Sequence, residues 1–160
     1  MINPRIRELK INNYKKKIEN LLVNFNEIDV MHSSNISISN KEFITTFYYH
    51  SNVFVTEFPI FDQVKNKYFE STDKIEREAF EMLRQNLSIF ERFQKVKFTY
   101  DLNEETFIIG CLSSEINKIL LFLPEITLPF TIYNEEETAI LAVDRLEYHI
   151  EFVQLCLVDE

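Results

Sequence analysis

The chain of 160 residues contains a single glycine, Gly110, and this scarcity limits the kinds of site that its backbone can form. Phosphate-binding loops, dinucleotide fingerprints, nucleophile elbows and calcium loops need glycine where the backbone has a positive φ or approaches a ligand closely. Most of these motifs need more than one glycine. The sequence therefore excludes the glycine-dependent nucleotide-binding and hydrolase classes, and we expect no cofactor.

Size and composition predict one globular domain over residues 1–160. Hydrophobic residues make up 46% of the chain, enough for a domain of this length to bury a core without disulfides or metal. The longest apolar runs are about six residues, whereas a membrane span needs roughly 20. No continuous apolar segment of a secretory signal is present, and Cys111 and Cys156 lie in apolar surroundings, as reduced buried thiols do. We therefore expect a cytoplasmic protein.

The hydrophobic pattern predicts an α+β fold, an antiparallel sheet of about four to six strands packed with three or four helices. Asn3 followed by Pro4 is typical of a helix start, and apolar residues at three- and four-residue spacing then predict a helix over 4–25. Short runs of β-branched and aromatic residues, separated by polar clusters, predict an antiparallel meander over 27–58.

The rest of the chain is predicted to be mostly helical. A capping-box pattern and an apolar stripe predict a central helix over 73–94, with a shorter helical piece near 61–70. Residues 95–112 predict a hairpin, followed by a short helix that ends at the next proline. Asn134 and the acidic residues after it favour a helix from 134, whereas apolar–polar alternation over 146–152 favours a strand. We predict the helix.

Charge is distributed unevenly along the chain. Residues 1–20 hold six basic and two acidic residues, whereas residues 101–160 hold two basic and thirteen acidic ones, a net charge of −11. Such a field repels nucleic acid and anionic lipid and attracts basic protein surfaces. We therefore predict a basic protein partner, no nucleic acid and no membrane. The alternatives are that the acidic third only keeps the protein soluble, or that the basic N-terminal helix docks against it.

A small acidic domain without a catalytic motif is typical of proteins that bind and neutralise or regulate a more basic protein. Bacterial immunity proteins, antitoxins and phage-encoded inhibitors share this profile, which is a likeness of type and not of residues. The predicted function is accordingly a non-catalytic, acidic, protein-binding domain. The residues expected to contact the partner are acidic or aromatic: Glu135, Glu136, Glu137, Asp144, Glu147, Glu151, Tyr48 and Tyr49.

Two other functions stay open. The region 43–69 is rich in aromatic residues, and an exposed face there would suit the interface of a structural subunit or adaptor in a larger assembly. A glycine-poor enzyme would need a site assembled from distant residues, and its candidates are His32, His50, His149, Glu147 and Glu151. On a strand, Glu147-x-His149-x-Glu151 would present an imidazole and two carboxylates on one face. We expect an exposed polar surface there and no metal or catalytic site.

Overall fold

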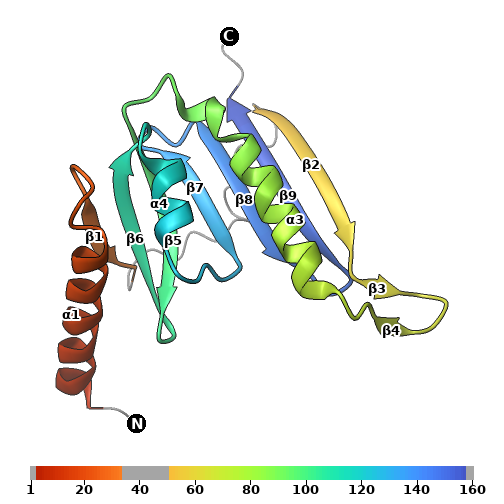
Figure 1. The fold of residues 1–160 in the computed structure, drawn as a ribbon, viewed down its shortest axis with the longest axis horizontal. Helices are drawn as coiled ribbons and strands as arrows, with labels where there is room; N and C mark the ends of the chain where they lie inside the picture. Colours follow the sequence, from red (N-terminus) through yellow and green to blue (C-terminus); the bar gives the residue numbers. More distant parts are fainter. Residues whose placement is uncertain (1–2, 34–50, 158–160) are drawn as a thin grey trace.

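The computed structural model of the protein describes residues 3–33 and 51–157 and confirms the α+β prediction (Figure 1). In this part of the chain, seven strands form one antiparallel sheet in the order β1-β6-β5-β7-β8-β9-β2, and β3 and β4 form a separate hairpin. The elements are α1 (Pro4–Leu21), β1 (Asp29–His32), β2 (Ser51–Pro59), β3 (Phe61–Asp62), β4 (Lys67–Tyr68), α3 (Thr72–Gln85), a 3₁₀ turn (Leu87–Phe90), β5 (Lys95–Leu102), β6 (Glu105–Leu112), α4 (Ile116–Phe122), β7 (Phe130–Asn134), β8 (Ala139–Arg145) and β9 (His149–Leu157).

The main hydrophobic core lies between the sheet and the helices. Helix α3 crosses β8 and β9 (Figure 1), and its buried Ala79 and Leu83 belong to the same cluster as Ile150 and Phe152 of β9. Successive side chains of a strand point to opposite faces. The residues of β9 that alternate with Ile150 and Phe152 therefore point to the face away from α3.

That second face carries a smaller hydrophobic cluster. It consists of side chains from the three central and C-terminal strands β7, β8 and β9, packed together with Val53 of β2: Tyr133, Ile140, Ala142, Val153 and Leu155. Because both faces are apolar here, β8 is buried along most of its length, and five successive residues, Ala139–Val143, are inaccessible to solvent.

The predicted C-terminal helix is wrong, because the segment forms the strands β8 and β9. Asn134 does act as a cap, but it caps a turn between strands: its Oδ1 accepts hydrogen bonds from the backbone N–H groups of Thr138 (2.8 Å) and Ala139 (2.9 Å). An asparagine at a helix start makes similar bonds, so the local signal is the same in both structures. The alternation over 146–152 is the correct signal, and the additional strands explain why the sheet is larger than predicted.

The short helix predicted near 61–70 is also wrong, because these residues form the β3–β4 hairpin. Asp62 Oδ1 accepts hydrogen bonds from the backbone N–H groups of Val64 (3.0 Å) and Lys65 (3.2 Å), which closes a turn. Asn66 has a φ of 52°, a left-handed conformation that asparagine tolerates in turns. Local side-chain bonds to the backbone therefore outweigh helix formation here.

Both long helices form but are shorter than predicted. Helix α1 ends at Leu21 and not at 25, and α3 ends at Gln85 and not at 94. After α3, the Asn86 side chain donates a hydrogen bond to the Met82 carbonyl (2.7 Å) and the chain continues into a 3₁₀ turn. The predicted hairpin over 95–112 and the short helix after it are confirmed as β5–β6 and α4.

The meander predicted over 27–58 is not found in the described residues. Its strands β1 and β2 lie at opposite edges of the sheet, since β1 pairs with β6 and β2 pairs with β9. Tyr48 and Tyr49 lie outside the described residues. No helix in the described part of the chain is long and apolar enough to cross a membrane.

Candidate functional site

Three carboxylates form a row across one end of the sheet. The strand register places Asp144 of β8 opposite Glu151 of β9, and Glu151 opposite Glu57 of β2. Residues that are directly opposite each other point to the same face. Their neighbours Val143 and Phe152 belong to the main core, so Asp144, Glu151 and Glu57, here called the acidic row, lie on the face away from α3.

The acidic row has little compensating positive charge. Among the described residues, no lysine or arginine side chain forms an ion pair with it. Arg145 donates its backbone N–H to Asp144 (2.8 Å), but its guanidinium pairs with Glu76 of α3 (3.5 Å). Burial raises the pKa of Asp144 above its ordinary value, against a smaller opposing effect of the Arg145 N–H group. Like charges opposite each other in a sheet are destabilising, so a cation brought to this row would relieve repulsion.

His149 lies beside the acidic row, two residues before Glu151 and on the same face. Its Nε2 atom is 3.6 Å from Glu57 Oε1 and 3.8 Å from Glu151 Oε2. Both distances are longer than a hydrogen bond, and Nε2 is buried without a hydrogen-bond partner. One imidazole nitrogen and one oxygen from each of these two glutamates lie within 4.8 Å of one another. We call Glu57, His149 and Glu151 the His–Glu cluster.

The sequence pattern found two members of this cluster and missed the third. His149 and Glu151 do share a strand face, as the alternation predicts. Glu147, however, is exposed in the turn between β8 and β9, and its expected place is taken by Glu57 from β2. Nothing near Glu57 in the sequence marks it, because only the pairing of β2 with β9 brings it to His149.

Exposed aromatic rings lie close to this end of the sheet. The Tyr148 ring, next to His149 in the chain, contacts the Phe61 ring with a centroid distance of 4.9 Å. Phe61 in turn contacts Tyr68 edge-on at 5.1 Å. Both tyrosines are exposed, and a hydrogen bond with Glu147 raises the pKa of Tyr148. Aromatic and acidic side chains therefore adjoin each other on this part of the surface.

The predicted triplet Glu135, Glu136 and Glu137 lies at the other end of β8, in the turn after β7. Glu135 and Glu136 are exposed and line a hollow of about 210 Å³ together with Lys95. At about 3.3 Å per residue, a strand of this length separates the triplet from the acidic row by roughly 20 Å. The structure thus divides the predicted acidic residues into two groups.

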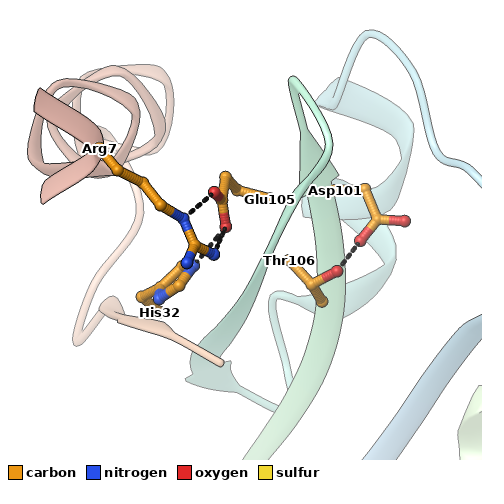
Figure 2. A network of polar contacts seen from close by, with 5 residues as sticks. All are labelled: Arg7, His32, Asp101, Glu105 and Thr106. Carbon is orange, nitrogen blue, oxygen red and sulfur yellow. Dashed lines mark hydrogen bonds and ion pairs between the residues drawn. The ribbon is translucent and has the colours of Figure 1, made fainter. Parts of the chain in front are cut away.

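A separate polar network lies at the β1 edge of the sheet (Figure 2). Arg7 Nε donates a hydrogen bond to Glu105 Oε1 (3.0 Å), and His32 Nε2 is 2.7 Å from Glu105 Oε2. These hydrogen bonds, from Arg7 first and His32 second, lower the pKa of Glu105, and the pKa of Arg7 is raised. The network connects α1, β1 and β6. It also provides one contact between the basic helix and the acidic C-terminal third, at the edge of the sheet opposite the acidic row.

The two histidines that the structure describes, His32 and His149, are not brought together. Four strands separate β1, which carries His32, from β9, which carries His149, a distance of about 24 Å at the usual strand spacing. His50 lies outside the described residues. A groove of about 360 Å³ between α3 and the segment that follows α4 is lined by apolar and charged side chains, including Phe80, Arg84 and Leu123, and by neither His32 nor His149. The structure therefore does not form an enzyme site that uses both His32 and His149.

Comparisons with known proteins found no matching family model, curated protein or solved structure.

Proposed function

We propose that the protein is a non-catalytic domain that binds and regulates a basic partner protein, and that the acidic row is the centre of the binding surface. The observation that carries the proposal is the alignment of Asp144, Glu151 and Glu57 on one face of three adjacent strands. No lysine or arginine of the described residues pairs with them. Glu147 in the neighbouring turn extends the negative surface.

The chemistry of this surface favours arginine on the partner. A guanidinium can bond a carboxylate with two N–H groups and can also stack on an aromatic ring. The acidic row offers the carboxylates, and the exposed rings of Tyr148 and Tyr68 offer the aromatic faces. A nucleic acid partner is disfavoured, because phosphates would be repelled by the same carboxylates.

The test compares two charge reversals of equal size. Glu57→Lys with Glu147→Lys changes the proposed surface, and Glu135→Lys with Glu136→Lys makes the same charge change at the other end of β8. All four side chains are exposed, so both double variants should fold. The partner is captured from a host extract at low salt with a chelator present, purified, and mixed with each variant in a stopped-flow instrument.

We expect the first double variant to slow association by a factor of roughly ten or more at low ionic strength. The matched variant should have a smaller effect. The difference should fade as added salt shortens the Debye length below about 10 Å. Equal rates for the parent and the first variant at every salt concentration would overturn the proposal, as would a larger effect of the matched variant.

One observation favours a second function, that of a subunit in a larger assembly. Strand β2, at the edge of the sheet that the described residues form, exposes Phe54 (61%) and Val55 (47%), one on each face. An exposed apolar edge strand is a template for pairing with a strand of another chain. Sedimentation equilibrium tests this idea: self-association that Phe54→Ser abolishes, and that the loop control Val64→Ser leaves unchanged, would support it. A monomer at all concentrations would count against self-assembly.

A further inference from the structure

The His–Glu cluster is held on paired backbone, which fixes the positions of its three members. The β2–β9 register places Glu57 opposite Glu151 and Pro59 opposite His149. At the start of β9, the Leu146 N–H donates a hydrogen bond to the His149 carbonyl (2.8 Å), which closes the turn before the strand. The three side chains therefore start from strand positions and not from a loop, which favours a defined geometry.

Two of the three distances within the cluster are close to those around a small metal ion, and the third pair of ligand atoms lies within 4.8 Å. Zinc bonds of about 2.0–2.2 Å in a tetrahedron place neighbouring ligand atoms about 3.3–3.6 Å apart. His149 Nε2 is 3.6 Å from Glu57 Oε1 and 3.8 Å from Glu151 Oε2. The Glu57 side chain is 62% exposed, so it can rotate by the small amount that closer coordination needs.

The burial of the His149 Nε2 atom supports the same site, in a side chain that is 27% exposed as a whole. Nε2 is buried and has no hydrogen-bond partner, whereas buried polar atoms in folded proteins are nearly always satisfied. Both carboxylate oxygens face it from beyond hydrogen-bond distance. A cation between the three atoms would use the nitrogen lone pair and would also neutralise the two glutamates.

We propose that Glu57, His149 and Glu151 bind one zinc ion, with the open side of the site left to water. A nitrogen donor combined with two carboxylates suits zinc, whereas magnesium and calcium prefer sites made only of oxygen atoms. Sequence alone favoured a plain polar surface here, and it did not indicate Glu57, which lies on a distant strand. The test of the zinc site does not need the proposed partner, because zinc binding is measured with the metal alone.

The experiment is calorimetric titration of the full chain with zinc chloride. We expect a site of one zinc per chain that Glu57→Gln and His149→Gln each weaken by at least about tenfold, since losing even an outer-shell partner costs about that much. Two controls should bind zinc like the parent: Glu147→Gln, in the adjacent turn, and His32→Gln, beside a glutamate at the other edge of the sheet. Cobalt(II) should give the visible absorption of a tetrahedral site in the parent and not in His149→Gln.

Zinc affinity in both Glu57→Gln and His149→Gln equal to the parent's would overturn the assignment, and so would the absence of binding at millimolar zinc. The second result would mean that His149 only forms a long ion pair with its two glutamates. Displacement of zinc by an equal concentration of magnesium or calcium would also contradict the proposal. Circular dichroism checks that each variant is folded. If His149→Gln is unstable, the zinc titration of Glu57→Gln still tests the proposal, because the Glu57 side chain is exposed.

Discussion

Leu83 provides the sharpest test of the packing between α3 and the sheet. It is fully buried in the main core, and Leu83→Ala removes three carbon atoms from that environment. At about 0.8 kcal/mol per buried methylene, the lost transfer free energy is about 2.4 kcal/mol. The cavity left behind increases the cost, and we expect a total loss in unfolding free energy of about 3–5 kcal/mol.

The assay is urea unfolding followed by far-UV circular dichroism. The control is Glu81→Ala on the same helix, where the side chain is 53% exposed and pairs with Arg84 (2.9 Å). An exposed pair three residues apart contributes about 0.2–0.5 kcal/mol, so this variant should unfold almost like the parent. If Leu83→Ala is too unstable to purify, Leu83→Met keeps the volume and should cost less than about 1.5 kcal/mol. Equally mild effects of Leu83→Ala and Glu81→Ala would refute the packing of α3 described above.

Three further predictions concern single polar groups. Hydrogen bonds from Arg7 and His32 lower the pKa of Glu105. The ionised carboxylate therefore stabilises the fold above the unfolded-state pKa, and this stabilisation is lost as the pH falls through the folded-state pKa. Glu105→Gln should cost about 1 kcal/mol of unfolding free energy at neutral pH and should flatten the acid side of the stability profile measured with urea. Burial raises the pKa of Cys111 to about 12, so a thiol reagent at mildly alkaline pH should label it only in denaturant, and labelling in the native state would contradict this. Asn134→Ala removes two bonds to backbone N–H groups, of 2.8 and 2.9 Å, and should cost about 1–3 kcal/mol in the same unfolding assay.

In β5 and α3, two of the elements that were predicted correctly, one buried face decides the pattern. In β5, Val96, Phe98 and Tyr100 are buried and the residues between them are partly exposed, which gives the alternation that the sequence shows. In α3, Ala79 and Leu83 lie four residues apart on the buried side. The spacing of apolar residues is enough to predict whether such an element is a helix or a strand, because the element buries only one of its faces.

The predicted C-terminal helix was wrong because the structure of that segment depends on its tertiary position. Ala139–Val143 is buried on both faces, so it has no period-two pattern, and spacing alone cannot distinguish such a strand from a helix. Asn134 also favoured the wrong prediction of a helix, because the same side-chain bonds that cap a helix here cap the turn between β7 and β8. Only the placement of β8 between β7 and β9 decides the outcome, and that placement is not encoded locally.

The candidate site shows the same division between local and long-range information. His149 and Glu151 are two residues apart, so a strand prediction suffices to place them on one face. Glu57 joins them only because β2 pairs with β9 in a particular register, and a shift of one residue would turn Glu57 to the helix-covered face. Its role therefore could not be predicted before the sheet order was known.

The two proposals are thermodynamically connected, because Glu57 and Glu151 belong to both the acidic row and the His–Glu cluster. A bound zinc ion neutralises two of the negative charges that would attract a basic partner, so each ligand should weaken the other. The equilibrium coupling must be reciprocal: the factor by which zinc lowers partner affinity equals the factor by which the partner lowers zinc affinity. Asp144 and Glu147 keep their charge in the zinc-bound state, which predicts weakened but not abolished association.

The stopped-flow assay, repeated at increasing zinc concentrations, tests this coupling. Zinc should slow association of the parent and leave the association rate of Glu57→Gln nearly unchanged. A parent that binds zinc yet associates at an unaltered rate would place the partner surface away from the acidic row while leaving the metal site intact.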